Sequence, residues 1–298
     1  MFKNHFLRQQ ESDIIKYIYI CDLDGTLLNN RARLSKEVAS GLNNLLDKDL
    51  LFTYITGRDL MSSREIMEKI DIKMPVAVCN GGLIIDFKSG ELIKGCFIER
   101  NIVEGLLKLS EKMQMYPNLT LYMHSMVRTC YFALDRRINR EYYRNKIDRN
   151  TFTQFEAKRI EDVVTDKVIS IAFVDLKEKI EDSKPYVIKE FGNLASISFF
   201  EDPFDKSILI IDITSQLCSK GTAAQYIADM YGLPKDSIVA FGNDLSDVEL
   251  LKMAGVGIAV GDSPAELKKI ATTELTYNEG YSVLKYIAEH FNTTKGAG

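Results

Sequence analysis

The segment Asp22-Leu23-Asp24-Gly25-Thr26 directly follows the apolar run Ile-Ile-Lys-Tyr-Ile-Tyr-Ile-Cys at residues 14–21. Two carboxylates therefore stand two residues apart at the end of a predicted β-strand. On an extended chain they point the same way, and like charges repel unless a cation lies between them. Mg²⁺ suits such oxygen ligands. The segment thus indicates a Mg²⁺ site at the carboxyl end of a buried strand, although on spacing alone a solvated turn explains it equally well.

Size and charge limit the classes of protein to which the chain can belong. It has 298 residues, 46% of them hydrophobic and 27% charged, a size and composition typical of about two globular domains. Its net charge of −4 gives no general attraction for nucleic acid. No apolar run reaches the roughly 18 residues of a membrane span, and residues 1–13 are polar with no apolar signal core. We therefore expect a cytoplasmic protein without a nucleic-acid or membrane partner.

The cysteines and histidines do not form a recognisable site. Five cysteines are scattered without metal-ligand spacing, mostly inside apolar runs, so we expect reduced and mostly buried thiols. The three histidines lie far apart along the chain. This distribution argues against a histidine-based metal or nucleophile site.

The two ends of the chain alternate strand and helix signals. The continuously apolar strands are expected at residues 14–21, 50–55, 75–79, 238–241 and 256–260. The segments with helical spacing are residues 34–46, with Ser35 as N-cap, 61–70, 220–231, 248–253 and 282–291. Fraying is expected after Asn292. Short strands that are apolar on both faces and separated by helices are typical of parallel βαβ units.

The middle of the chain has a different pattern. The β-prone segments there are residues 119–126, 127–134, 168–174, 196–200 and 208–213, and they are mixed with helical stretches. The sequence therefore predicts an α/β fold in which residues 1–85 and 210–298 form a core with a parallel sheet. Residues 86–209 are predicted to form an inserted α+β domain.

Polar side chains follow several of the predicted strands. Asp22 and Asp24 follow the first strand, Thr56 follows the second, and Asn243, Asp244 and Asp247 follow a late strand, while Lys220 opens a helix. In a parallel sheet, these strand ends lie at one edge. Carboxylates, a hydroxyl and a lysine that converge there suit phosphoryl transfer. A cation and an ammonium group neutralise the phosphate while an aspartate attacks it.

Four segments resemble the motifs of the haloacid dehalogenase (HAD) superfamily of phosphotransferases, in particular the Cof-like group of subclass IIB with a C2-type (C2B) cap. They are Asp22-Leu23-Asp24-Gly25-Thr26-Leu27-Leu28, Ile55-Thr56-Gly57-Arg58, Ser219-Lys220-Gly221 and Phe241-Gly242-Asn243-Asp244-Leu245-Ser246-Asp247. The second and third segments are weak signals alone, but all four occur in order after suitable strands. The resemblance implies a Rossmann-like core with a parallel sheet and a cap inserted after the third core strand.

The resemblance also implies roles for individual residues. Asp22 would be the nucleophile and a direct Mg²⁺ ligand. Asp24 would be the general acid and base and would give Mg²⁺ its backbone carbonyl. Thr56, Gly57 and Lys220 would bind the transferred phosphoryl group.

The fourth segment departs from the usual Gly-Asp-x-x-Asn-Asp pattern of this family. A gapless alignment places Asn243 at the first aspartate and Ser246 at the asparagine. Either Asn243 is a neutral metal ligand and Asp247 holds its charge near the metal through a water, or the loop shifts and Asp244 faces the metal. Both alternatives predict that the metal binds more weakly here than at a site with the usual pattern. Asp262 replaces a common asparagine, and its role stays open.

Further residues have two interpretations each. Arg58 either leans into the active site or pairs with a surface acid. Asn80 and Gly81 either contact substrate through their backbone or only form the turn into the cap. The run Arg136–Arg149 is either a solvated helix face or a phosphate-facing surface.

The sequence thus predicts a Mg²⁺-dependent phosphatase that acts on small phosphorylated metabolites, sugar phosphates above all, through an aspartyl-phosphate. A phosphomutase of the same superfamily is a close alternative. A non-catalytic phospho-ligand or protein-binding module with a decayed metal site is the alternative from another class.

Overall fold

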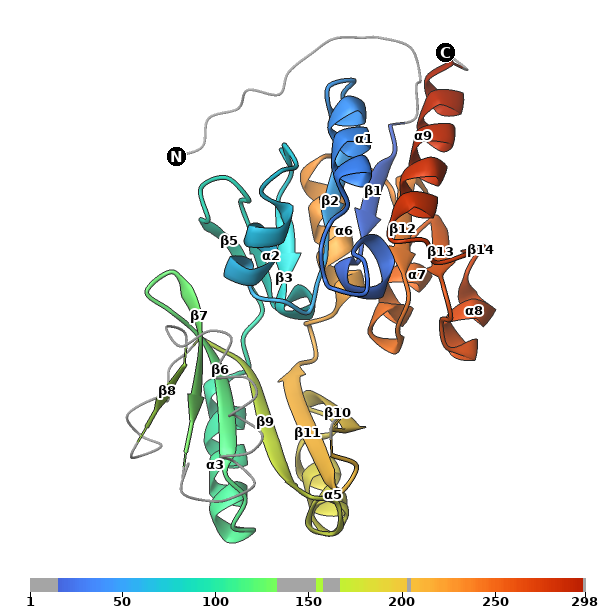
Figure 1. Cartoon of the computed structure of the whole chain (residues 1–298). Coiled ribbons are helices and arrows are strands. Elements are labelled where there is room, and N and C mark those ends of the chain that lie inside the picture. Colours follow the sequence, from blue (N-terminus) through green and yellow to red (C-terminus); the bar gives the residue numbers. More distant parts are fainter. Residues whose placement is uncertain (1–15, 133–153, 158–166, 203–204, 297–298) are drawn as a thin grey trace. The chain divides into compact units, whose positions relative to one another are not determined.

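The computed structural model describes residues 16–132, 154–157, 167–202 and 205–296 (Figure 1). Two compact units make up the chain. The first contains the residues up to Tyr54, Ile66–Met74 and the residues from Ala224 on, and the second contains Ile55–Glu65 and Pro75–Ala223. The run Arg136–Arg149 lies outside the described residues. The cap limits expected from the sequence, residues 86–209, stay a prediction.

The first unit is built on a five-stranded sheet with the order β14-β13-β12-β1-β2. Its strands are β1 (Ile18–Cys21), β2 (Leu51–Tyr54), β12 (Ile238–Gly242), β13 (Val256–Val260) and β14 (Thr273–Leu275). All of their pairings are parallel, and Cys21 stands opposite both Phe241 and Tyr54. The predicted α/β class with a parallel sheet is therefore confirmed. Asp22 and Gly242 come next to each other at the carboxyl ends of β1 and β12.

Several helices precede or follow these strands along the chain. They are α1 (Lys36–Leu46), α7 (Val248–Met253), α8 (Ala265–Ile270), α9 (Tyr281–Gly296) and the part of α6 (Lys220–Met230) from Ala224 on. Ser35 caps α1 as predicted, because its Oγ accepts the N–H of Val38 at 3.2 Å. The fraying expected after Asn292 is wrong, since α9 continues to Gly296 and the hydroxyls of Thr293 and Thr294 donate to carbonyls one turn back. Within the described ranges, no helix combines the length and apolar character of a membrane span.

The second unit begins with a small antiparallel sheet. Its strands are β3 (Val76–Val78), β4 (Leu83–Ile85) and β5 (Leu92–Gly95), and α2 (Leu60–Met67) starts in this unit. The strand expected at residues 75–79 forms, but among the described residues its parallel pairing is limited to one bridge, between Ile55 and Ala77. Positive φ angles at Cys79, Asn80 and Gly81 turn the chain back, so β3 pairs with β4.

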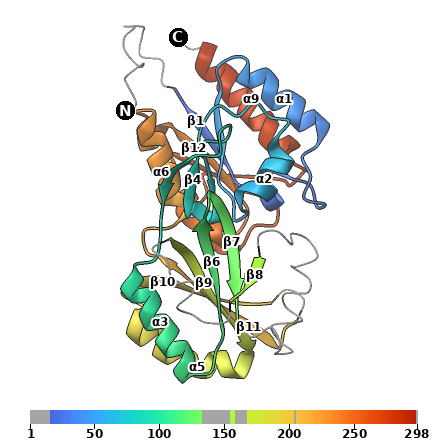
Figure 2. The same cartoon turned by 90° about the vertical axis from the view of Figure 1, so that its left-hand side faces the viewer.

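A six-stranded sheet forms the rest of the second unit, with the order β10-β11-β9-β6-β7-β8. Its strands are β6 (Pro117–Met123), β7 (Met126–Tyr131), β8 (Gln154–Glu156), β9 (Val168–Leu176), β10 (Ala195–Glu201) and β11 (Ile208–Ser215). Helices α3 (Arg100–Lys112) and α5 (Lys177–Phe191) lie beside it (Figure 2). Val103 and Leu106 of α3 and Val187 of α5 share one core cluster with strand residues such as Leu119 and Ile171.

A partly buried aromatic cluster contains a histidine in the first unit. The Tyr19 hydroxyl lies 2.8 Å from Nδ1 of His290, and the Tyr17 and Tyr286 rings pack on the imidazole at centroid distances of 4.7 and 5.9 Å. Burial lowers the pKa of His290 from its ordinary value of 6.5. The cluster therefore favours the neutral imidazole.

This cluster predicts a stability that falls in mild acid. Below pH 6.5 the unfolded chain binds a proton at His290 that the folded protein excludes, so the contribution of His290 is complete above pH 6.5 and is lost as the pH falls toward the lower folded pKa. We expect the urea midpoint of unfolding of the wild-type protein to be lower at about pH 5.5 than at about pH 7.5. This decrease should be smaller in His290→Gln. Equal losses in both proteins would contradict this assignment.

Candidate active site

The first motif is a tight turn at the end of β1. The Asp22 N–H donates to the carbonyl of Phe241 at 3.0 Å, and Asp22 is only 4% exposed. Residues Leu23–Leu27 form one wide helical turn that is interrupted at Asp24 and at Gly25, where φ is +77°. The interruption leaves Asp24 exposed and returns Thr26 to the interior. The two carboxylates thus occupy different environments, one buried and one in water.

The fourth motif lies against the first. The Thr26 hydroxyl donates to Oδ1 of Asn243 at 3.0 Å. A Cβ at position 25 would lie 2.2 Å from Nδ2 of Asn243, so only glycine fits there. These contacts join the loop after β1 to the loop after β12, and they direct the Asn243 side chain toward the first motif.

The two aspartates of the fourth motif accept hydrogen bonds from N–H groups of their own loop. Asp247 is fully buried, and its Oδ2 accepts the N–H groups of Asn243 at 2.9 Å and of Asp244 at 3.1 Å. Asp244 is exposed, and its Oδ1 accepts the N–H of Leu245 at 2.6 Å. The carboxylate of Asp247 therefore fixes the loop, whereas Asp244 caps the turn that follows.

The second motif forms a turn in the second unit. Thr56 is fully buried, its N–H donates to the Ala77 carbonyl at 3.0 Å, and its own carbonyl accepts the Asn80 N–H at 2.8 Å. Its Oγ1 accepts the N–H of Arg58 at 3.2 Å. A Cβ at Gly57 would lie 3.1 Å from the Asn80 side-chain oxygen. The turn at Asn80 thus packs against the turn that holds the Thr56 hydroxyl.

The third motif opens α6 in the same unit. Ser219 caps the helix, because its Oγ accepts the N–H of Thr222 at 3.0 Å. Lys220 follows in the first turn and is only 3% exposed. Gly81 has φ +89°, and a Cβ there would lie 2.4 Å from the Ser219 carbonyl oxygen. The turn of Asn80 and Gly81 therefore lies directly against the start of α6 and joins the second motif to the third.

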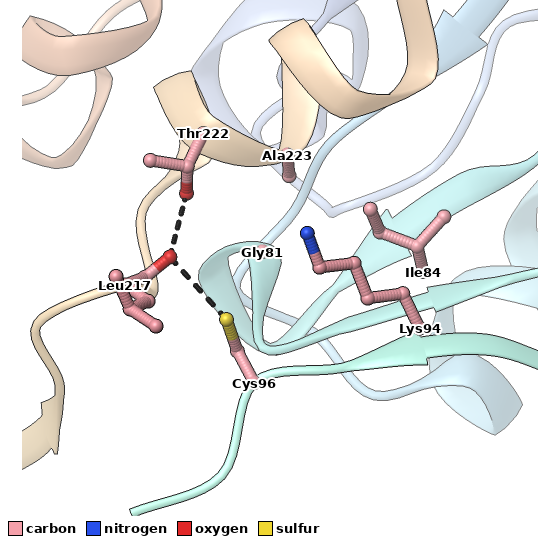
Figure 3. Close-up of a pocket in the computed structure, with 7 residues that line it drawn as sticks. All are labelled: Gly81, Ile84, Lys94, Cys96, Leu217, Thr222 and Ala223. Atoms are coloured by element: carbon pink, nitrogen blue, oxygen red, sulfur yellow. Dashed lines mark hydrogen bonds between the residues drawn. The ribbon is translucent and has the colours of Figure 1, made fainter. Parts of the chain in front are cut away.

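A small cavity lies next to this junction (Figure 3). It is lined by Gly81, Ile84, Lys94, Cys96, Leu217, Thr222 and Ala223. The Leu217 carbonyl accepts from the Thr222 hydroxyl at 2.9 Å and from the Cys96 thiol at 3.3 Å. The cavity has a volume of about 20 Å³, which is room for one water. The cavity is therefore too small for a phosphorylated substrate. Burial raises the pKa of Cys96, and it raises that of Cys218 to about 12, so both thiols stay protonated and are poor nucleophiles.

The oxygen atoms of the first unit are a suitable set for Mg²⁺. Asp22 and Asp247 are buried carboxylates, Asn243 contributes an amide oxygen, and Asp24 has a main-chain carbonyl. In the part of the chain that the structure describes, no three histidine, cysteine, aspartate or glutamate residues gather as a metal cluster. Mg²⁺ usually keeps several waters and needs only one or two carboxylates, so the donor set fits this ion.

The geometry adds two residues to which sequence reasoning gave no role. Thr26 holds Asn243, and Ser219 caps the helix that begins with Lys220. Thr26 belongs to the first motif and Ser219 to the third, so the motifs already pointed to both residues. The sequence alone does not show their hydrogen-bond partners. Asp262 is exposed after β13, and within the described ranges no contact of its side chain assigns it a role.

A sequence profile of the haloacid dehalogenase-like hydrolase family matches residues 19–287. One curated relative is the 5-amino-6-(5-phospho-D-ribitylamino)uracil phosphatase YitU of Bacillus subtilis. It is 24% identical over 279 residues, which cover 93% of this chain and 98% of the relative.

Solved structures share the fold. A haloacid dehalogenase-like hydrolase from Bacteroides thetaiotaomicron has a TM-score of 0.74 at 18% identity, with 93% of this chain and 100% of that chain covered. The HAD subclass IIB sugar phosphatase BT4131 has a TM-score of 0.69 at 18% identity, with 93% and 99% covered.

These findings confirm the resemblance that the four motifs carry. They also agree with the enzyme class expected from the sequence, a phosphoric monoester hydrolase. The profile covers the chain from β1 into α9 and thus includes every motif described above. The chain belongs to the haloacid dehalogenase-like hydrolase family.

Proposed function

We propose that this protein is a Mg²⁺-dependent phosphatase that hydrolyses small phosphorylated sugars or polyols through an aspartyl-phosphate. The observation that carries the proposal is the junction in the first unit. There the buried Asp22 stands at the end of β1, and the adjoining turn is bonded through Thr26 to the oxygen-bearing Asn243. The ribityl phosphate in the name of the Bacillus subtilis relative supports a polyol phosphate as the substrate class.

Two carboxylates in different environments suit a two-step displacement. In the first step, an oxygen of Asp22 attacks phosphorus, the ester P–O bond breaks, and Asp24 gives its proton to the departing alkoxide. In the second step, Asp24 takes a proton from the attacking water, and phosphate leaves Asp22. The exposure of Asp24 is compatible with access to both the alcohol and the water. A bound Mg²⁺ would reduce the charge repulsion between Asp22 and the phosphate.

The second and third motifs have the donors that a phosphoryl group requires. Because Oγ1 of Thr56 accepts from the Arg58 N–H, its own hydrogen can be donated to a phosphate oxygen. The Gly57 N–H and the Lys220 ammonium complete this group in the proposal. Asn80 and Gly81 pack against both motifs, and they are proposed to hold these loops and to contact substrate through their backbone.

Asn243 is the better candidate for completing the metal site. Its oxygen accepts from Thr26 of the first motif, whereas Asp244 caps its own turn at Leu245. Asp247 is proposed to act on the metal through a water, because its Oδ2 already accepts two loop N–H groups. A neutral amide leaves less negative charge around the ion, so we propose that Mg²⁺ binds more weakly than it would to a carboxylate.

The nucleophile can be tested with an aryl phosphate in the presence of Mg²⁺. We expect Asp22→Asn to lower kcat by at least about 100-fold, because an amide cannot form the phosphoenzyme, and Asp244→Asn to stay within about twofold of wild type. Full activity in Asp22→Asn would exclude Asp22 as nucleophile. Incubation with a hexose 1-phosphate separates the alternatives. Free phosphate supports a phosphatase, the isomeric hexose phosphate supports a mutase, and binding without turnover supports a decayed module.

The charge of the metal site can be tested at position 243. We expect Asn243→Asp to tighten Mg²⁺ binding by about tenfold, measured by calorimetry on the free enzyme, because the added charge faces the cation. Thr26→Val removes the hydrogen bond that holds the amide, so it should weaken binding. An unchanged Mg²⁺ affinity in Asn243→Asp would contradict a role of this position in the metal site.

A further inference from the structure

The loop between β14 and α9, residues 276–280, contacts the turn of the first motif within the first unit. The hydroxyl of Tyr277 donates to the carbonyl of Leu28 at 2.9 Å, across 249 residues of sequence. Gly280 lies so close to the carbonyl of Leu27 that a Cβ at this position would clash with its oxygen. Two successive carbonyls at the end of the first-motif turn are thus both in contact with this loop.

The loop is anchored on both sides. A Cβ at Gly261, directly after β13, would lie 2.8 Å from the Cβ of Tyr277, so the two backbones are closely packed. The N–H of Gly261 also donates to the carbonyl of Leu275 at 2.8 Å. At the other end, the carbonyl of Gly280 accepts the N–H of Leu284 in α9 at 3.0 Å. Tyr277 therefore stands on a support made of β13 and α9.

The Tyr277 hydroxyl keeps its hydrogen at neutral pH. Burial and the neighbouring Glu279 raise the pKa of Tyr277 above its ordinary value of 10.0. The ring is half-buried. The hydroxyl is thus a steady donor to the Leu28 carbonyl.

The turn that Tyr277 contacts contains Asp24. It is closed by the N–H of Leu28, which donates to the carbonyl of Leu23 at 2.9 Å. Asp24 lies between these two residues, where the helical geometry is interrupted. Because Asp24 is exposed, packing restrains its side chain little, and the backbone of the turn largely decides where its carboxylate stands. Leu28 is therefore bonded through its N–H to the turn of Asp24 and through its carbonyl to Tyr277.

We propose that Tyr277 is a positioning residue for Asp24, which it holds in place through the Leu28 carbonyl and the turn that Leu28 closes. The proposal rests on the phosphatase function proposed above and adds to it a residue outside the four motifs. A general acid must stay within hydrogen-bond reach of the ester oxygen that it protonates. A turn that has lost one of its anchors holds the Asp24 carboxyl at that oxygen for less of the time, so the step that needs the proton slows.

The test compares two aryl phosphates that differ in their need for a proton, on the full-length protein with Mg²⁺. p-Nitrophenolate leaves readily as an anion, whereas phenolate is a poorer leaving group and gains more from a proton donor. Because kcat/KM includes the step in which the leaving group departs, the ratio of kcat/KM for phenyl phosphate to that for p-nitrophenyl phosphate reports on the acid. We expect Tyr277→Phe to lower this ratio by at least about fivefold. Tyr281→Phe, the matched control, removes the hydroxyl of a nearby exposed ring and should leave the ratio unchanged.

Amide hydrogen exchange gives a second readout that does not need activity. In Tyr277→Phe, the N–H of Leu28 should exchange at least about fivefold faster than in the wild-type protein, because the turn opens more often. Tyr281→Phe should leave this exchange unchanged. Gly280→Ala places a methyl group against the Leu27 carbonyl while it keeps the Tyr277 hydroxyl, and it should change both readouts in the same direction as Tyr277→Phe.

The outcomes separate this inference from the catalytic proposal. If the wild-type enzyme hydrolyses both esters, the ratio decides. A lower ratio in Tyr277→Phe supports the inference, whereas an unchanged ratio, with or without an equal loss for both esters, overturns it and leaves the phosphatase assignment intact. If the wild-type protein hydrolyses neither ester, the proposed function fails, and the exchange of the Leu28 N–H decides. Faster exchange in Tyr277→Phe then supports the hold of Tyr277 on the turn, and equal exchange overturns it.

Discussion

The hydrogen bond from Thr26 to Asn243 is the contact on which the catalytic assignment depends. It joins two loops that are 217 residues apart in sequence, and it forms only because position 25 has no side chain. Parallel pairing of β1 with β12 brings the two loops to the same sheet edge. Without this contact, the loop after β12 would still lie beside Asp22, but the Asn243 amide oxygen would not be held toward the first motif.

The amide at position 243 changes the charge of that junction. Acidic side chains that gather at a strand end repel one another when no cation is present. In this chain the side chain nearest the first motif is neutral and accepts a hydroxyl, while Asp247 is held by two N–H groups of its own loop. The hydrogen bonds of Asn243 and Asp247 thus lie within these two loops. A neutral side chain at position 243 also leaves less negative charge at this strand end than a carboxylate would.

Local signals in the sequence predicted local structure well. The cap at Ser35 and the strand Val256–Val260 appear as expected, because both depend on neighbours in the chain. The predictions failed where tertiary contacts decide. Helix α5 has Pro185 in its interior and was not predicted, although Val187 and Phe191 bury it against the sheet. The motifs located the candidate residues, but the role of Thr26 depends on a partner that no local pattern reveals.

The six-stranded sheet of the second unit illustrates the same limit. Alternation in single strands, such as Asn118-Leu119-Thr120-Leu121, indicates one buried and one polar face. It does not say which polar residues become neighbours, because a slip of one residue in any pairing would move them to the other face. The register places Asn118 between Tyr131 and Ala172, and neither neighbour satisfies its amide. The register, and not the pattern of any single strand, therefore decides which polar side chains become neighbours on this sheet.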